Sequence, residues 1–168
     1  MIEKILRKSF IISSLLVFSI FLFDRLSKIY VIFLDNKFFG SEIFSSKFLN
    51  ISLIWNDGIA FGLLSFEESF FYNLLTIIIL TIMIIIIVMA IKSEGFKKYS
   101  LLMILGGALG NFFDRITYKA VPDFLDFHIG NFHWFIFNIA DVFITTGVIF
   151  MILNEFIGNN KSVKNEKN

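Results

Sequence analysis

The segment 70–91 constrains the fold more than any other, because it contains no charged residue. A helix that crosses a bilayer needs about 20 predominantly apolar residues, since its backbone must satisfy its own hydrogen bonds in lipid. Hydrophobic residues make up 57% of the 168-residue chain, above the roughly half that is usual for a soluble domain. The sequence predicts an integral membrane protein with a single domain over residues 1–168.

Three other segments, 10–33, 99–116 and 134–157, fit the same pattern with more interruptions. The first is apolar until Asp24, the second is diluted by glycines, and the third is interrupted by Asp141. We therefore predict an all-α bundle of four transmembrane helices. The basic start and apolar run of the first segment also fit a cleavable signal peptide, but no small-x-small cleavage site follows, which favours an uncleaved helix.

Most of the 15 Lys and Arg residues lie on one side of these four segments. They precede the first segment, separate the second from the third, and follow the fourth: Lys4, Arg7, Lys8, Lys92, Lys97, Lys98, Lys161, Lys164 and Lys167. The opposite loops, 35–69 and 117–133, contain only Lys37, Lys47 and Lys119. Cytoplasmic loops carry an excess of Lys and Arg, so both termini are expected in the cytoplasm.

Two segments outside the predicted spans have compositions that predict their local structure. Residues 48–55 mix aromatic and β-branched side chains, which predicts a strand in the outer loop. Residues 159–168 are polar, which predicts a disordered cytoplasmic tail.

Six charged residues lie inside or at the ends of the predicted spans. They are Asp24, Arg25, Lys28, Asp114, Arg115 and Asp141. An Asp, Lys or Arg costs roughly 2.5–3.5 kcal/mol at the centre of a spanning helix on insertion scales. With the orientation above, all six lie toward the outer ends of their helices. Scattered structural ion pairs have no reason to gather at one depth, so this layer predicts a functional site near the outer membrane surface.

The spacing of polar and small residues places several of them on shared helix faces. Asp24 and Lys28 are four residues apart, in the favourable order of acid before base. Asn111 and Arg115 share a face of the third span in the same way, and the motif Gly106-x-x-x-Gly110 permits close approach of a neighbouring helix.

Asp123 and Asp141 are candidates for a pair of carboxylates in a partly dehydrated pocket. If the fourth span begins near Trp134, Asp141 lies roughly 10 Å below the interface, and Asp123 lies on the same side. Two close carboxylates cannot easily both ionise, so one holds a proton while the other activates water. From spacing alone, Asp123 as a helix cap and Asp141 as a packing contact remain alternatives, and Asp126 competes with Asp123.

Five sequence blocks occur in order along most of the chain. They are Asp24-Arg-Leu-Ser-Lys28, Asn56-Asp-Gly-Ile-Ala-Phe-Gly62, Gly106-Gly-Ala-Leu-Gly-Asn-Phe-Phe-Asp-Arg115, Val121-Pro-Asp-Phe-Leu-Asp-Phe127 and Phe137-Asn-Ile-Ala-Asp141. Each block alone is a weak signal. In this order, on four spans with this orientation, they make the chain resemble the lipoprotein signal peptidase (signal peptidase II) family.

The resemblance implies four transmembrane helices with a small periplasmic β-cradle and a short amphipathic helix. It implies an aspartyl endopeptidase, without a metal or other cofactor, that removes signal peptides from diacylglyceryl-modified prolipoproteins just before the lipidated cysteine. The family's catalytic pair corresponds to Asp123 and Asp141. Its supporting residues correspond to Asp24, Lys28, Asn56, Gly58, Asn111, Arg115, Asn138 and Ala140. Asp114 is interpreted as structural.

The supporting residues suggest further roles as hypotheses. Asn111 and Asn138 are expected to hold the substrate backbone, and Arg115 is expected to pair with Asp24 or another acid. The loop 56–62 is expected to close over the peptide.

The resemblance also implies partners and a location. The expected partners are prolipoprotein substrates, membrane lipid and globomycin-type inhibitors, with no nucleic acid. The expected location is the bacterial cytoplasmic (inner) membrane, where the protein is a monomer with its active site near the periplasmic face. Two positions depart from the family pattern: Pro122 stands where many members carry a small aliphatic residue, and Phe135 where many carry proline.

Other classes of protein fit the sequence less well. The chain contains no cysteine, which excludes a cysteine nucleophile and a thiolate metal site. His128 and His133 are five residues apart without a His-Glu-x-x-His motif, which disfavours a zinc protease. A small transporter or proton pathway would also place Asp and Lys in spans, but its polar residues would run through the bilayer. A non-enzymatic bundle leaves the acidic layer unexplained.

Overall fold

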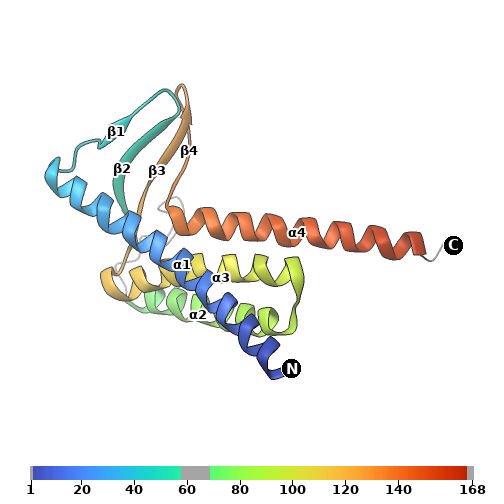
Figure 1. Cartoon of the computed structure of the whole chain (residues 1–168). Helices are drawn as coiled ribbons and strands as arrows, with labels where there is room; N and C mark the ends of the chain where they lie inside the picture. The colour runs from blue at the N-terminus through green and yellow to red at the C-terminus, as the bar shows by residue number, and fades with distance from the viewer. Residues whose placement is uncertain (1, 58–68, 166–168) are drawn as a thin grey trace.

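The protein consists of four long α-helices and a four-stranded antiparallel sheet that stands at one end of the helices (Figure 1). The computed structural model describes residues 2–57 and 69–165, with side chains described for residues 9–57 and 72–157. The helices are α1 (Ile2–Lys37), α2 (Ser69–Lys92), α3 (Gly95–Tyr118) and α4 (Ile139–Asn165). The strands are β1 (Phe44–Ser45), β2 (Leu49–Asn56), β3 (Val121–Ile129) and β4 (Phe132–Phe137).

Three of the helices are long and apolar enough to cross a membrane, which agrees with a mostly helical membrane protein. The qualifying segments are Ser9–Lys37, Tyr72–Lys92 and Ile139–Ile157. α3 forms a helix where a span was predicted, but its glycine and polar residues keep it outside this group.

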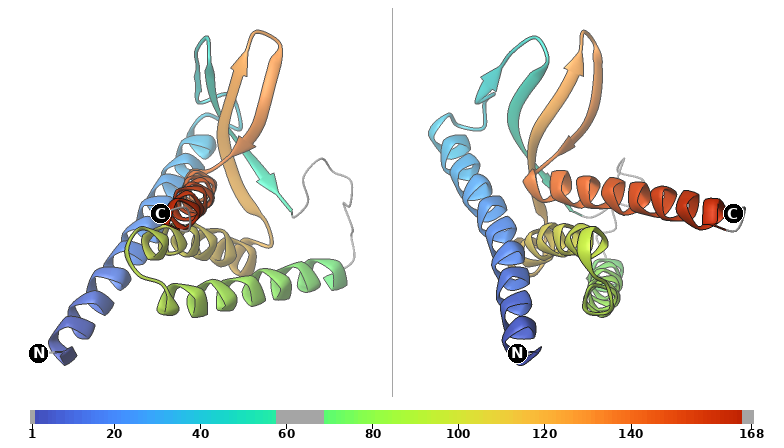
Figure 2. Two further views of the ribbon diagram at one scale, coloured as in Figure 1. Left: turned by 90° about the vertical axis from the view of Figure 1, so that its right-hand side faces the viewer. Right: turned by 45° about the vertical axis from the view of Figure 1, so that its right-hand side comes forward.

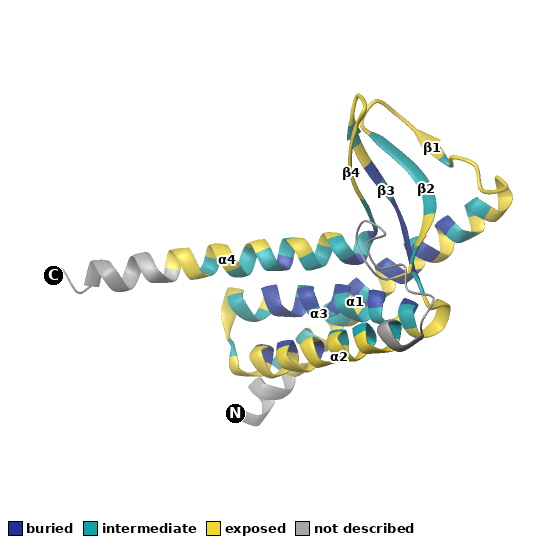
Figure 3. Cartoon of the chain, turned by 180° about the vertical axis from the view of Figure 1, so that it is seen from behind, coloured by how far each residue is buried: buried dark blue, intermediate teal, exposed yellow. Residues whose placement is uncertain are grey.

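The helix α3 lies at the centre of the bundle and contacts α1, α2 and α4. Its buried residues, together with those of β3, form the most enclosed part of the protein (Figure 3). The N-terminal end of α1, the α2–α3 turn and the C-terminal end of α4 lie away from the sheet (Figures 1 and 2). Chain segments that were predicted on one side of the membrane therefore lie at one end of the molecule.

Glycines allow the close approach of the helices to α3, as the Gly106-x-x-x-Gly110 motif predicted. A Cβ atom at Gly106 would lie 2.8 Å from Cβ of Ile20 on α1, and one at Gly110 would overlap the carboxylate of Asp24. At Gly107 a Cβ would overlap the carbonyl oxygen of Ala140 on α4. Only a residue without a side chain fits at these contacts.

The sheet has the strand order β1-β2-β3-β4, and every neighbouring pair is antiparallel. The predicted strand at 48–55 is present as β2, shifted by one residue. β3 pairs with β2 through Asn56↔Val121 and with β4 through Ile129↔Phe132. Gly130 at φ +59° provides the left-handed residue of the tight β3–β4 turn. The sheet therefore connects the chain before α2 to the chain before α4.

Two predicted boundaries are wrong. Residues 134–137 belong to β4, so the fourth helix begins at Ile139 and Asp141 lies in its first turn, not deep within a span. A short apolar run cannot be assigned to a helix or a strand by periodicity alone. Residues 134–137 form a strand because they pair with β3. Residues 159–165 of the predicted tail belong to α4, and residues 166–168 lie outside the described residues. The described residues contain no separate short amphipathic helix.

Candidate active site

A buried ionic cluster joins α1 to α3. The ammonium group of Lys28 is fully buried and donates hydrogen bonds to Asp24 Oδ2 at 2.8 Å, Asn111 Oδ1 at 2.8 Å and Asp114 Oδ2 at 2.7 Å. Arg25 pairs with the other oxygen of Asp114. Both carboxylates are fully buried, so each depends on these cations for compensation. The predicted Asp24–Lys28 contact is present, and Asp114 has the structural setting that was expected of it.

The same cluster fixes the beginning of α4. Asp24 Oδ1 accepts a hydrogen bond of 2.9 Å from the backbone N–H of Ala140, in the first turn of α4. Negative charge is favourable at a helix N-terminus, where backbone N–H groups lack partners within the helix. Arg115 does not pair with Asp24; among the described residues its guanidinium donates to the carbonyl of Asn111 at 3.2 Å. The expected pairing of Arg115 with Asp24 or another acid is absent among the described residues, and Asp24 pairs with Lys28 instead.

Asn138 caps α4 and connects the two candidate carboxylates. Its Oδ1 accepts a hydrogen bond of 3.1 Å from the Asp141 backbone N–H, while Asp141 Oδ2 accepts one of 3.1 Å from the Asn138 backbone N–H. This reciprocal arrangement is a capping box. Nδ2 of Asn138 also donates to Asp123 Oδ1 at 2.6 Å. One amide side chain therefore positions Asp123 on β3 relative to Asp141 on α4.

Asp141 is also held from α3. Nδ2 of Asn111 donates to Asp141 Oδ1 at 2.8 Å, while Oδ1 of the same amide accepts from Lys28. Since both functional groups of Asn111 are engaged, the amide orientation is determined by the ionic cluster on one side and by Asp141 on the other. Asn111 and Asn138 thus contact the candidate catalytic carboxylates.

Asp123 is a buried carboxylate with two amide donors. The residue is 4% exposed, and its carboxylate accepts hydrogen bonds from Asn138 and from Asn56 Nδ2 on β2, the latter at 2.9 Å. The pKa of Asp123 is raised from the usual 3.8 to about 6, chiefly by burial and to a smaller extent by the negative charge of Asp141. The hydrogen bonds from Asn56 and Asn138 and the charge of Lys28 act in the opposite direction. Loss of hydration therefore dominates, so Asp123 holds a proton more readily than an ordinary aspartate.

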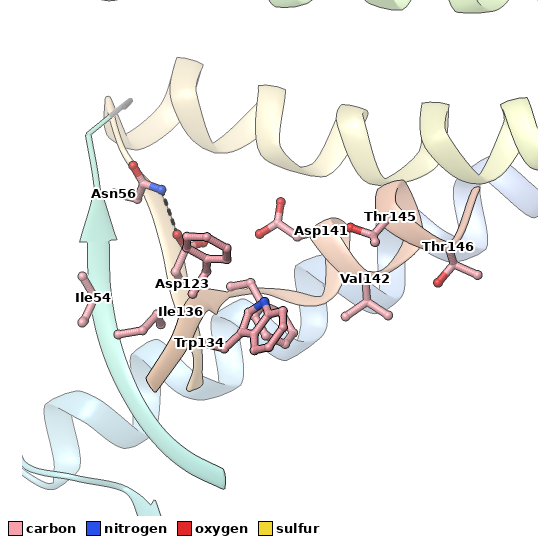
Figure 4. A pocket seen from close by; sticks show the side chains of 11 residues that line it. Ile54, Asn56, Asp123, Trp134, Ile136, Asp141, Val142, Thr145 and Thr146 are labelled. Carbon is pink, nitrogen blue, oxygen red and sulfur yellow. Dashed lines mark hydrogen bonds between the residues drawn. The ribbon is translucent and has the colours of Figure 1, made fainter. Parts of the chain in front are cut away.

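Asp123 and Asp141 line one cavity of about 720 Å³ between the sheet and α4 (Figure 4). Asn56 lies at the strand side of this cavity, and Thr145 and Thr146 line it further along α4. Apolar and aromatic side chains form most of the remaining wall: Ile54, Trp134, Phe135, Ile136, Phe137 and Val142. An apolar cleft with a few convergent polar groups is typical of a ligand-binding site.

The structure separates Asp126 from Asp123. Oδ2 of Asp126 lies 2.8 Å from Nδ1 of His133 on β4, and Asp123 is the member of this pair that lines the cavity. Pro122 lies beside Asp123 in β3 opposite Trp55, and Val121 before it begins the strand, which fits the extended conformation that proline favours in its predecessor. Gly58 and the rest of the loop 58–62 lie outside the described residues.

The sequence analysis missed the aromatic wall that β4 contributes. Trp134 and Phe137 were assigned to the predicted fourth span, and no place at the site was predicted for their side chains. The Gly-Asn pair 130–131 between two runs rich in aromatic and β-branched residues was the available signal for a hairpin.

Comparisons with known proteins agree on one family. The family model described as signal peptidase (SPase) II matches residues 16–157. A lipoprotein signal peptidase of Pelagibacter ubique (strain HTCC1062) is 48% identical over 166 residues, covering 99% of each chain. One of Francisella tularensis subsp. novicida (strain U112) is 37% identical over 140 residues, covering 80% of this chain and 87% of the relative.

Solved structures resemble the fold as well. A bacterial membrane enzyme determined by the in meso method at 2.3 Å resolution superposes with a TM-score of 0.71 at 33% sequence identity, covering 89% of this chain and 90% of the other. A second such structure, at 1.9 Å resolution, gives a TM-score of 0.69 at 33% identity over 84% and 90% of the two chains.

Proposed function

Since the chain belongs to the signal peptidase II family, we propose that it cleaves prolipoprotein signal peptides by aspartyl catalysis with Asp123 and Asp141. Membership of the family makes it a membrane protease that processes lipoprotein signal peptides. The function of a transporter, considered for the same acidic layer, has no such support. The observation that carries the catalytic assignment is the pair of carboxylates that share one cavity and are connected by Asn138.

The hydrogen bonds around the two carboxylates suggest a division of roles. Asp141 lies in the first turn of α4, where the helix N-terminus favours a negative charge, and it accepts N–H donors from Asn111 and from the Asn138 backbone, as suits the base. Asp123 has the raised pKa and holds the shared proton. Asp141 takes a proton from a water molecule, whose oxygen then bonds to the scissile carbonyl carbon. Asp123 gives its proton to the leaving nitrogen as the carbon–nitrogen bond breaks.

The cavity suits the class of substrate that the family implies. Its aromatic and aliphatic wall accommodates the apolar part of a signal peptide or the diacylglyceryl chains beside the cysteine, while Thr145 and Thr146 offer hydroxyl groups along α4. Globomycin-type inhibitors are expected to compete for this cavity. The protein is proposed to work as a monomer among membrane lipids, because one chain supplies both carboxylates.

We further propose that α3 is a fourth transmembrane helix. Its 24 residues give a length of about 36 Å, enough for the hydrocarbon core of about 30 Å. The residues that lower its hydropathy, including Asn111 and Asp114, are buried against neighbours and satisfied there. Residues 1–168 then form one domain in the bacterial inner membrane, with both termini cytoplasmic and the sheet periplasmic.

The orientation is testable because the chain contains no cysteine. A single cysteine introduced by Ser41→Cys, beyond the outer end of α1, should react with a membrane-impermeant maleimide in intact spheroplasts. A cysteine introduced by Ser93→Cys, at the α2–α3 turn, should react only after the membrane is permeabilised. The reverse pattern of labelling would refute the proposed orientation.

The catalytic assignment is tested by cleavage of a diacylglyceryl-modified prolipoprotein in detergent. Asp123→Asn and Asp141→Asn should each lower kcat by at least about 10³-fold, because each removes a proton acceptor or donor that the reaction needs. Asp126→Asn is the matched control, since it neutralises a buried carboxylate of the same strand that pairs with His133 outside the cavity. Activity retained by Asp123→Asn and lost by Asp126→Asn would overturn the assignment.

A further inference from the structure

A second cavity, of about 550 Å³, is lined by residues of α1, α2 and α3. The N-terminal part of α1 and the α2–α3 turn, next to which its polar end lies, are away from the sheet (Figure 1). Its walls include Val17 and Phe18 of α1, Ile87 of α2, and Leu102 and Leu105 of α3. None of its lining residues is shared with the cavity that contains Asp123 and Asp141. The proposed catalytic mechanism therefore gives this groove no role.

The groove is polar at one end and apolar along the rest of its length. Ser9, Ser13 and Ser14 of α1 and Lys98 of α3 line the polar end. Lys98 Nζ donates to Ser9 Oγ at 2.9 Å, and Ser13 Oγ donates to the Ser9 carbonyl at 2.9 Å. From Lys98 to Leu109 the helix rises about 16 Å at about 1.5 Å per residue, which matches one leaflet of a hydrocarbon core of about 30 Å.

The charge at the polar end is not compensated within the described chain. No carboxylate of the described side chains lies within ion-pair distance of Lys98, and an ammonium group has three N–H donors of which Ser9 accepts one. Lys92 and Lys97 lie at the α2–α3 turn beside Lys98, and with Glu94 as the one carboxylate of residues 92–98 this turn carries a net positive charge. An anionic group that enters here would meet Lys98 and the exposed hydroxyl of Ser14.

We propose that this groove binds an anionic phospholipid, with the phosphate at Lys98 and an acyl chain along the apolar walls between α1 and α3. The occupant is assigned to lipid because positive charge sits at the membrane-surface end of an apolar groove of leaflet length, and because clusters of Lys beside a spanning helix attract anionic lipids. With the proposed orientation, the lipid comes from the cytoplasmic leaflet. The site does not depend on the catalytic assignment.

The test is native mass spectrometry of the full-length protein in detergent, titrated separately with phosphatidylglycerol and with phosphatidylcholine of the same acyl chains. The parent should bind phosphatidylglycerol about fivefold more tightly than phosphatidylcholine, because this is the effect expected of one Lys near an anionic surface. Lys98→Gln should abolish this preference, and Lys98→Arg should keep it. Ser14→Trp, which places a ring in the groove at an exposed position, should weaken binding of both lipids.

Lys47→Gln is the matched control, because it removes one positive charge from the exposed sheet end of the molecule. It should bind both lipids as the parent does. Equal affinity of the parent for the two lipids, or an unchanged preference in Lys98→Gln, would overturn the proposal. Occupation of the groove by a second copy, seen as a dimer that Ser14→Trp dissolves, would overturn it too. Binding is measured without substrate, so the result stands apart from that of the cleavage assay.

Discussion

Replacement of Lys28 by methionine tests the buried ionic cluster that supports the candidate active site. Lys28→Met keeps an unbranched apolar side chain as far as Cε and removes the ammonium group, which contacts Asp24, Asn111 and Asp114 at 2.7–2.8 Å. The parent cluster is neutral, because Arg25 and Lys28 balance the two carboxylates. The variant leaves one uncompensated negative charge in a site with no exposed surface at Asp24 or Asp114.

The expected loss of stability is about 3–5 kcal/mol, the range for removal of one partner from a buried ion pair. The loss should not exceed this range, because each carboxylate keeps one partner: Asp114 still pairs with Arg25, and Asp24 still accepts a hydrogen bond from the Ala140 N–H. The double variant Lys28→Met/Asp24→Asn restores neutrality, so it should recover about 2 kcal/mol relative to the sum of the single variants.

Unfolding in mixed dodecyl maltoside and SDS micelles, followed by circular dichroism, measures these free energies. Lys47→Met is the control, because Lys47 is exposed and its loss should change stability by less than about 0.5 kcal/mol. A loss below about 1 kcal/mol in Lys28→Met, or strict additivity in the double variant, would refute the reasoning. In cleavage assays Lys28→Met should lower kcat more than it changes KM, since Asn111 loses the donor that orients it toward Asp141.

Two further predictions concern the carboxylates and the packing around them. The proton on Asp123 is lost as pH rises through about 6, so kcat/KM should fall above that pH; Asn56→Ala removes a hydrogen bond that lowers this pKa and should move the alkaline limb of the profile up by about one unit. An alkaline limb that stays in place would contradict the proton on Asp123. Gly107→Ala should lower the free energy of unfolding by about 1–3 kcal/mol in the same assay and should also lower kcat, because its methyl group displaces Ala140 in the turn that carries Asp141. Unchanged kcat and stability would contradict a tight contact between Gly107 and Ala140.

Several elements followed from the sequence because their causes are local. The second span was predicted at 70–91 and is found at Ser69–Lys92, since an uncharged apolar run of that length has one stable form in lipid. The Asp24–Lys28 contact follows from the rise and turn of a helix, which bring residues four apart onto one face. The close approach at Gly106 and Gly110 follows from the missing side chains.

The assignment of residues 134–137 failed because its cause lies elsewhere in the chain. The run is apolar and fits a helix or a strand equally well, and its partner strand β3 decides between them. That pairing moves the beginning of α4 to Ile139, which brings Asn138 into the capping position and Asp141 into the first turn.

The sequence alone therefore determined an apolar helical membrane protein, the family it resembles and the residue types of its acidic layer. The tertiary structure decided which of these residues meet. Asn56, Asp123 and Asn138 come from three segments, and only the register of the sheet and the end of β4 place their side chains in contact. A hydrogen bond between residues so far apart in the sequence requires a donor–acceptor distance that is correct to within a few tenths of an ångström. No local pattern in a sequence specifies such a distance.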